Sequence, residues 1–180
     1  MSVLVAYASK HGATRGIAER IADRLRAAGQ EAKARPVEAA SDLAGYDAFV
    51  IGSAAYMGRW RKDAVELVRR NRDLLASRPV WLFSSGPLGK EALDAQGRDK
   101  RESAVPTEIA EFREAIKPRD HRVFFGALSP TKLGFGERLI RMLPAGRALL
   151  PEGDFRDWQD IDGWAESIVQ ELAQAPASRR

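Results

Sequence analysis

The segment spanning residues 3–14 constrains the fold of this chain more than any other part of the sequence. The short apolar run Val3–Tyr7 has the length and composition of a buried strand. Within a few residues it passes into a helical pattern, in which Ile17, Ile21 and Leu25 lie four positions apart on one face. Gly12 permits a tight turn between the two elements, where unpaired backbone N–H groups and the positive end of the helix dipole converge. Such a turn is a ready binding site for phosphate.

The spacing within this turn narrows the choice of phosphate ligand. The sequence has no G-x-x-x-x-G-K-[ST] run, and the turn has only Gly12 and Gly16 where a dinucleotide fingerprint needs three glycines. The hexapeptide Ser9-Lys10-His11-Gly12-Ala13-Thr14 resembles the phosphate loop of flavodoxins, a hydroxyl-x-x-Gly-x-hydroxyl pattern after the first strand. The resemblance implies that backbone amides and the Ser9 and Thr14 hydroxyls bind the phosphate of FMN. The alternative is an ordinary strand-to-helix turn in which Ser9 or Thr14 caps the helix.

Strands and helices alternate along the rest of the chain, which is the pattern of a parallel sheet covered by helices on both faces. We therefore expect an α/β fold with a flavodoxin-like, doubly wound parallel sheet of five strands in the order 2-1-3-4-5. The single domain would span residues 1–175, and residues 176–180 would form a frayed tail. The strands are expected at Val3–Tyr7, Glu31–Arg35, Ala48–Gly52, Val80–Ser84 and Arg122–Ala127. The helices are expected at Ala13–Ala28, Trp60–Ala76, Thr107–Ile116 and Gly163–Ala173.

In such a sheet the ligand binds beyond the carboxyl ends of the strands, so the loops after strands 1, 3 and 4 should build the site. After strand 3, small residues let the backbone approach a flat ring, and Tyr56 or Trp60 offers an aromatic face for stacking. Trp60 can instead begin the next helix and pack into the core. The glycine-rich loop Ser84–Gly89 can donate amide hydrogen bonds to the ring, or it can be a plain turn. It lacks an aromatic residue, which leaves one ring face open to a substrate.

The cofactor expected in these loops is FMN. The residues expected to contact it are Ser9, Lys10, His11, Gly12, Ala13 and Thr14 from the first loop, Ser53, Ala54, Ala55, Tyr56, Met57, Gly58 and Trp60 from the second, and Ser85, Gly86, Pro87, Leu88 and Gly89 from the third.

The composition excludes several other kinds of chemistry. The chain has no cysteine, and its two histidines, His11 and His121, are far apart, so we expect no metal site and no thiol chemistry. No run approaches the roughly 18 apolar residues of a spanning helix, and the first residues form a strand rather than a signal peptide. We therefore expect a soluble, cytoplasmic protein. Basic residues such as Arg69 and Arg70 have acidic neighbours, which indicates a solvated helix face rather than a nucleic-acid surface.

Three ordered motifs indicate a closer resemblance. They are Tyr-x-Ser-Lys-His-Gly-x-Thr at Tyr7–Thr14, Ile-Gly-Ser-Ala-x-Tyr-x-Gly at Ile51–Gly58, and Phe-x-Gly-Ala-Leu at Phe124–Leu128. Together they are similar to the flavodoxin-like protoporphyrinogen oxidases, the bacterial quinone-linked protoporphyrinogen IX dehydrogenases. The resemblance covers most of the chain and implies hydride removal from a reduced tetrapyrrole to FMN, followed by oxidation of the flavin by a membrane quinone.

The segment 129–151 distinguishes this chain from a minimal flavodoxin, which passes almost directly from its fifth strand to its last helix. The segment mixes apolar and basic residues at helical spacing. A cationic amphipathic stretch can lie on the anionic inner face of a membrane or bind a polycarboxylate such as a porphyrinogen. The alternative is an insertion whose Leu139, Ile140 and Leu143 pack on the core or at a homodimer interface. The basic residues expected to contact substrate or membrane are Lys132, Arg138, Arg141 and Arg147.

The sequence therefore predicts an FMN-dependent oxidoreductase whose flavin carries the chemistry. No residue stands out as a general acid or base, and the catalytic residues are unknown. Two other classes stay open at this point. One is a soluble flavodoxin-type electron-transfer protein without its own substrate, although such carriers are usually acidic and this chain has a net charge of +4. The other is a non-catalytic module whose phosphate loop binds a different anion.

Overall fold

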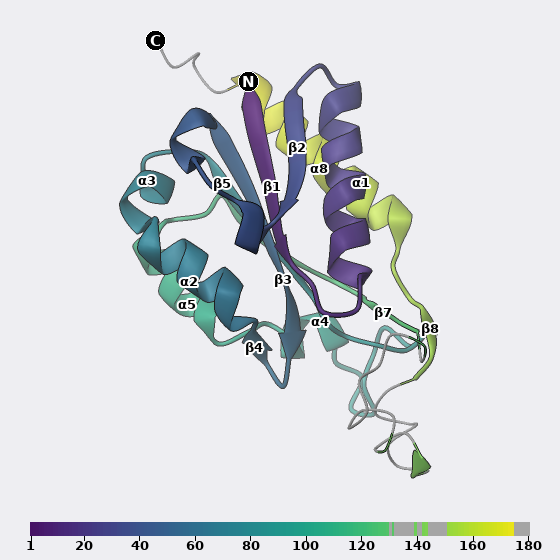
Figure 1. Cartoon of the computed structure of the whole chain (residues 1–180). Coiled ribbons are helices and arrows are strands. Elements are labelled where there is room, and N and C mark those ends of the chain that lie inside the picture. The colour runs from purple at the N-terminus through teal and green to yellow at the C-terminus, as the bar shows by residue number, and fades with distance from the viewer. Residues whose placement is uncertain (130, 132–138, 140–141, 144–150, 175–180) are drawn as a thin grey trace.

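The computed structural model of the chain describes residues 1–129, 131, 139, 142, 143 and 151–174. Its centre is a parallel sheet in the order β2-β1-β3-β5-β6 (Figure 1). The strands are β1 (Ser2–Ala8), β2 (Glu31–Pro36), β3 (Ala48–Tyr56), β5 (Val80–Ser85) and β6 (Asp120–Phe124). This is the predicted order 2-1-3-4-5, because β4 (Arg59–Trp60) is a short hairpin strand that pairs only with β3.

Helices cover both faces of the sheet, as Figure 1 shows. The helices α1 (Ala13–Ala27) and α8 (Trp158–Gln174) lie on one face, and α2 (Lys62–Arg70), α3 (Arg72–Ala76) and α5 (Glu108–Ala115) lie on the other. The alternation of β1 explains the two cores, because successive side chains of a strand point to opposite faces. Val3 and Val5 pack with α1 and α8, whereas Leu4 and Ala6 pack with α2 and α5.

Short elements connect this framework. Two 3-10 turns, Val37–Ala39 and Leu43–Gly45, follow β2. The helix α4 (Lys100–Ser103) lies in the long connection between β5 and α5. After β6 the strands β7 (Ala127–Leu128) and β8 (Gly153–Asp154) form a small antiparallel pair.

Four of the predicted elements have different bounds in the structure. The third strand runs on to Tyr56 and turns back at β4, so the next helix begins at Lys62 rather than at Trp60. The fifth strand ends at Phe124, because residues 127–128 pair with β8 outside the main sheet. The last helix begins at Trp158, where the Asp157 carboxylate accepts the backbone N–H groups of Gln159 and Asp160.

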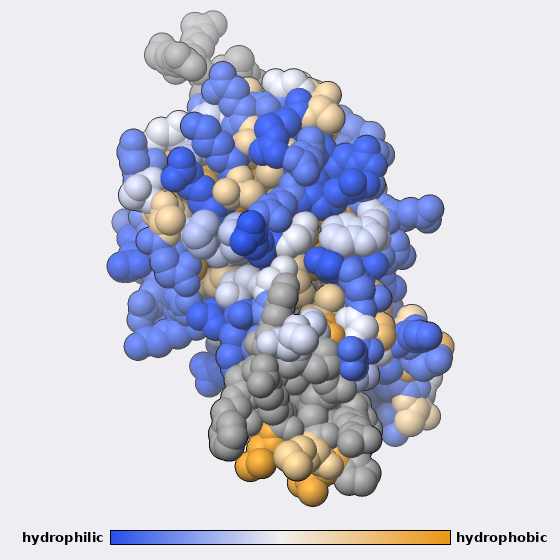
Figure 2. Space-filling model, turned by 45° about the vertical axis from the view of Figure 1, so that its right-hand side comes forward, coloured by the Kyte–Doolittle hydropathy of each residue, from blue (hydrophilic) through white to orange (hydrophobic). Residues whose placement is uncertain are grey.

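The predicted substrate or membrane contacts Lys132, Arg138, Arg141 and Arg147, and the predicted tail 176–180, lie outside the described residues. Of the apolar residues in the same segment, Leu139, Met142 and Leu143 are described, and all three are exposed. Packing of Leu139 and Leu143 on the core is therefore excluded. Figure 2 shows a largely hydrophilic face with a small hydrophobic group at its lower tip. Within the described ranges, no helix has both the length and the apolar character needed to cross a membrane.

Candidate functional site

A cavity of about 420 Å³ lies at the carboxyl edge of the sheet. Its position matches the predicted one, because β1, β3 and β5 all end there and the strand order reverses between β1 and β3. Residues 126–128, which follow β6, complete its wall. The lining residues are Ser9, Lys10, His11, Ala13, Thr14, Ala54, Ala55, Tyr56, Met57, Ser85, Gly86, Leu88, Gly126, Ala127 and Leu128.

The first loop, residues 9–14, forms a turn around Gly12. Gly12 adopts a left-handed conformation with φ of 90°, which a glycine accommodates without strain, and α1 begins at the next residue. Its backbone N–H donates to Ser9 Oγ at 3.0 Å, and its carbonyl accepts the Gly16 N–H at 3.1 Å. The N–H groups of Ala13 and Thr14 belong to the first helical turn, which offers them no helical partner. They are therefore placed to donate to an anion.

Thr14 connects this loop to the loop after β5. Its side chain is almost fully buried, and Oγ1 lies 3.2 Å from Ser85 Oγ. The alternative in which Ser9 or Thr14 caps the helix is not observed, because α1 has no side-chain cap. Ser9 and Thr14 both line the cavity instead.

The second loop is a β-hairpin whose turn is Met57-Gly58. Both residues have positive φ, 50° and 73°, and Tyr56 pairs with Arg59 across the turn. The Tyr56 ring is 41% exposed and lines the cavity. It is supported by two residues of the first loop, since His11 meets its edge with ring centroids 6.4 Å apart and Lys10 Nζ lies 5.9 Å from its centroid.

Trp60 does not line the cavity, which corrects the expectation that it could stack on a ligand there. It is 5% exposed and packs against Phe112 of α5 with ring centroids 5.4 Å apart. Its Nε1 donates to Ser84 Oγ at 2.7 Å. The cause is the hairpin register, which pairs Trp60 with Ala55 and turns the indole into the core that contains α2 and α5.

Four other residues that were expected to contact FMN do not line the cavity and lie elsewhere in the structure. Ser53 is buried at the base of the hairpin, where its Oγ accepts the Arg61 N–H at 3.0 Å. Gly58 forms the hairpin turn. The Pro87 carbonyl accepts the Gly126 N–H at 2.9 Å, which joins the loop after β5 to the segment after β6. Gly89 lies beyond this contact, in a neighbouring cleft.

Gly12 lines a second cleft of about 340 Å³ beside the first loop, together with Arg156. The Arg156 guanidinium stacks on Trp158 at 4.5 Å, bonds to the Asp154 carboxylate and reaches the Ala13 carbonyl at 3.4 Å. The hydrogen bonds from Arg156 hold the pKa of Asp154 below its usual range. A side chain at Gly16 would overlap this guanidinium, so glycine allows the arginine to lie against the first turn of α1.

Sequence reasoning missed Gly126, Ala127 and Leu128 as cavity residues. They follow β6, whose neighbour in the sheet is β5, and they reach the cavity because Gly126 pairs with Pro87. The only available signal was the motif at Phe124–Leu128, which does not indicate a place in the site.

This geometry agrees with the family to which the sequence matches. Residues 4–145 match the model of the flavodoxin domain family. The chain belongs to the flavodoxin domain family.

Solved structures show the same fold. A cysteine-to-serine mutant of flavodoxin from Pseudomonas aeruginosa is 19% identical, with a TM-score of 0.60 over 96% of this chain and 99% of that one. A flavodoxin from the domain Archaea is 14% identical, with a TM-score of 0.58 over 96% and 99% of the two chains. Rubredoxin oxygen:oxidoreductase from Desulfovibrio gigas is 14% identical, with a TM-score of 0.61 over 98% of this chain but only 37% of that one. A comparison with curated protein sequences found no match.

Family membership makes this an FMN-binding electron-transfer domain, and the cavity fits FMN. Its volume lies within the range of about 300–1,000 Å³ that is usual for small-molecule sites. The free amides of α1 suit the phosphate, and the small residues Ala54, Ala55 and Gly86 let the backbone approach a flat ring. A side chain at Gly86 would come within 3.2 Å of Ala55 Cβ and narrow that space. Bound FMN supplies hydride and single-electron chemistry, for which the protein provides binding and orientation.

Proposed function

We propose that this flavodoxin-family chain is an FMN-dependent oxidoreductase with a substrate of its own. The observation that supports an enzyme is the asymmetry of the cavity walls. Among the described lining residues, the aromatic side chains are His11, from the loop after β1, and Tyr56, at the end of β3. The part of the lining that follows β5 and β6 offers Leu88 and Leu128 in place of an aromatic ring. A flavin ring stacked on Tyr56 would therefore keep its other face available to a small organic substrate.

As substrate we propose a reduced tetrapyrrole, protoporphyrinogen IX, and as electron acceptor a quinone. Support comes from the three motifs at Tyr7–Thr14, Ile51–Gly58 and Phe124–Leu128, which resemble those of the quinone-linked protoporphyrinogen dehydrogenases. Most of the cavity lining comes from the first two motifs, and the third adds Gly126, Ala127 and Leu128.

The basic residues of the segment 129–151 are suited to bind an acidic substrate, or to bind the anionic membrane in which a quinone is dissolved. Lys132, Arg138, Arg141 and Arg147 carry charges that would attract porphyrinogen propionates or anionic lipid headgroups. The exposed apolar side chains of Leu139, Met142 and Leu143 lie between them in sequence. We propose that this segment makes a peripheral membrane contact, and a homodimer interface is the competing use for it.

A soluble electron carrier is the second candidate function. The whole-length likeness to flavodoxins favours it, since 96% of this chain aligns with 99% of each of two complete flavodoxin chains. The basic net charge of +4 is an argument against a carrier that docks on basic partners.

The first experiment is purification followed by an absorbance spectrum and mass analysis of the released cofactor, for which FMN is the expected result. The second measures protoporphyrinogen IX oxidation under anaerobic conditions with and without a quinone. Quinone-dependent turnover supports the enzyme, whereas FMN binding without turnover, combined with rapid electron exchange with a flavodoxin reductase, supports the carrier. A protein without FMN contradicts both.

A further inference from the structure

The side chain of Glu108 is buried, and a buried carboxylate destabilises a fold unless its oxygens accept hydrogen bonds. Glu108 is the first residue of α5, and its side chain is 5% exposed. Its Oε2 accepts the backbone N–H of Trp60 at 3.1 Å, and its Oε1 accepts Arg59 Nε at 3.1 Å. Burial would raise the pKa of the Glu108 carboxyl, but hydrogen bonds from its own backbone N–H, from Trp60 and from Arg59 outweigh burial and hold that pKa below its usual range. An ionised carboxylate is therefore bonded directly to the returning strand of the hairpin.

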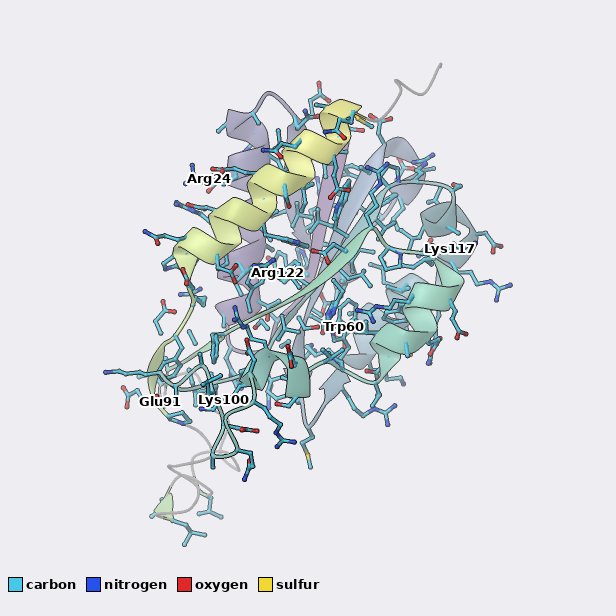
Figure 3. All side chains as sticks on the ribbon, turned by 180° about the vertical axis from the view of Figure 1, so that it is seen from behind. Arg24, Trp60, Glu91, Lys100, Lys117 and Arg122 are labelled. Atoms are coloured by element: carbon cyan, nitrogen blue, oxygen red, sulfur yellow. The ribbon has the colours of Figure 1, made fainter. Side chains whose placement is uncertain are left out.

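A second contact from the same place reaches the hairpin turn. The backbone N–H of Thr107 donates to the Gly58 carbonyl at 3.0 Å. Two consecutive residues, Thr107 and Glu108, thus bind three consecutive residues of the hairpin, Gly58 to Trp60. We call this set of contacts the hairpin clamp. Figure 3 shows Trp60, the last residue of the clamp, between the sheet and α5.

Packing at the tip of the hairpin is sparse among the residues that the structure describes. Met57 is fully exposed, so its side chain adds no packing, and both turn residues have left-handed backbone conformations. Below the clamp, Ser53 Oγ accepts the Arg61 N–H and the indole of Trp60 is buried, which anchors the base of the hairpin but not its turn. The clamp therefore holds the turn from the side of α5, while the Tyr56 ring before the turn also contacts His11 and Lys10.

The position of the turn determines one wall of the FMN cavity. The strand leading into it carries Ala55 and Tyr56, which line the cavity. Another part of the lining is Gly86 and Leu88, which follow β5, and the same stretch of chain continues to Thr107 and Glu108. The clamp thus joins the end of the segment that makes one wall to the hairpin that makes the other.

We propose that Glu108 is a positioning residue for FMN, which holds Tyr56 at the distance from the Leu88 wall that a single planar ring requires. Glu108 does not touch the cavity and acts through the hairpin. This inference rests on FMN occupying the cavity, as in the proposed function. Because the contacts of Glu108 are with the hairpin and its own helix rather than with residues 9–14, its loss should weaken the binding of any flavin, with or without a phosphate.

The experiment compares Glu108→Ala and Glu108→Gln with the matched control Glu111→Gln. Glu111 lies on the same helix and also bonds an arginine, Arg69 Nε at 2.8 Å, but on an exposed surface. Flavin affinity is measured by fluorescence titration of the apoprotein, once with FMN and once with riboflavin. For Glu108→Ala we expect both dissociation constants to rise by the same factor, at least about 10-fold, since charge-assisted hydrogen bonds are lost. The fluorescence of the bound flavin should increase because Tyr56 no longer stacks closely, and Glu111→Gln should match the parent.

Several outcomes would overturn the proposal. Folded Glu108→Ala protein with parental affinities and parental flavin fluorescence would show that Glu108 supports only the fold. A loss confined to FMN, with riboflavin binding unchanged, would place the effect at the phosphate instead. If Glu108→Ala does not fold, Glu108→Gln and Arg59→Met test the same contacts singly, and parental flavin properties in both would contradict the proposal. If the parent binds no FMN, the proposed function fails as well.

Discussion

Thr14 Oγ1 lies 3.2 Å from Ser85 Oγ, and this pair of hydroxyls joins the first turn of α1 to the end of β5. Both side chains are buried and both residues line the cavity, and either hydroxyl can be the donor in this pair. Each hydroxyl can donate one hydrogen bond while it accepts others. One of the two can therefore donate to its neighbour while the other donates into the cavity. The pair thus joins the loop of residues 9–14 to the loop after β5 at the cavity.

Replacing Thr14 by valine, which keeps the shape and removes the hydroxyl, should weaken FMN binding. A hydrogen bond to a charged phosphate is worth about 1.5–3 kcal/mol, which corresponds to a rise of about 10- to 150-fold in the FMN dissociation constant. The affinity for riboflavin should change much less. Ser77→Ala is the control, because the Ser77 hydroxyl only donates to the Leu74 carbonyl at the end of α3. An FMN dissociation constant unchanged in Thr14→Val would mean that residues 9–14 are not the phosphate site.

Tyr56 and Trp60 should give opposite results on substitution. Tyr56→Ala is expected to relieve the quenching of flavin fluorescence and to shift the flavin potentials, because Tyr56 is the aromatic side chain of the hairpin that lines the cavity. Trp60→Phe should leave flavin fluorescence nearly unchanged and lower the free energy of unfolding by about 1 kcal/mol or more, through loss of the bond to Ser84 Oγ. Titration with FMN checks the expected flavin fluorescence of each variant, and chemical denaturation checks the expected free energy of unfolding. Relief of quenching in Trp60→Phe alone would reverse the assignment.

Gly52 should tolerate no side chain. A Cβ at this position of β3 would overlap the ring of Phe83, which is fully buried and packs against Phe124 and Trp164. Gly52→Ala should therefore destabilise the fold by about 1–3 kcal/mol, the usual cost of overpacking a core. Gly163→Ala is the control in α8, where nothing lies near the added Cβ and alanine should stabilise the helix by up to about 1 kcal/mol. Equal unfolding free energies of the two variants in denaturant would refute this packing argument.

His121 should make the protein less stable in mild acid. Burial lowers the pKa of His121 to about 4, with a further contribution from Arg113 and opposition from Asp120. In the unfolded chain the pKa is about 6.5, so between these values the unfolded state binds a proton that the folded state does not. The free energy of unfolding should therefore fall by about 3 kcal/mol as the pH drops from about 6.5 to about 4, and this contribution is exhausted below that range.

The check is the free energy of unfolding of the parent and of His121→Gln, measured at about pH 7 and about pH 4.5. Carboxylates also titrate in acid, so the difference between the two proteins isolates His121. Glutamine can still pair with Ser84 Oγ, which lies 2.8 Å from His121 Nε2. Parallel pH dependence in both proteins would show that His121 is protonated equally in the folded and unfolded states.

Replacing Arg138 and Arg141 by glutamate should separate FMN binding from the membrane or substrate contact that we propose for the segment 129–151. FMN affinity should be unchanged, because the cavity residues belong to other segments. Binding to anionic vesicles and quinone-coupled oxidation of protoporphyrinogen IX should both fall sharply, since each basic residue contributes about 1 kcal/mol near an anionic surface and less in salt. Lys33→Glu with Arg35→Glu, on the exposed edge strand β2, is the control for net charge. Parental vesicle binding and turnover at low salt would favour the carrier, and a change in oligomeric state would favour a homodimer interface.

The fold and the edge of the sheet at which the cavity lies could be predicted from the amino-acid sequence, because both follow from local periodicities. The continuous apolar run Val3–Tyr7 predicts a strand that is buried on both faces, and the four-residue spacing of Ile17, Ile21 and Leu25 predicts a helix with one apolar face. Gly12 marks the turn through its backbone conformation, which is a property of the residue itself. With strands and helices in that order, the strand order and the ligand edge follow from the rules of parallel sheets.

Which side chains form the walls of the cavity could be seen only once the chain was folded. Tyr56 and Trp60 are both aromatic and only four residues apart, and one reaches the cavity while the other is buried because a two-residue turn sets the hairpin register. Leu128 reaches the cavity through a hydrogen bond between Gly126 and Pro87, which are far apart in sequence. Glu108, the first residue of α5, likewise contacts the hairpin through a hydrogen bond from the distant Trp60 N–H. Such contacts depend on how distant segments meet in three dimensions, and no local pattern in the sequence encodes that meeting.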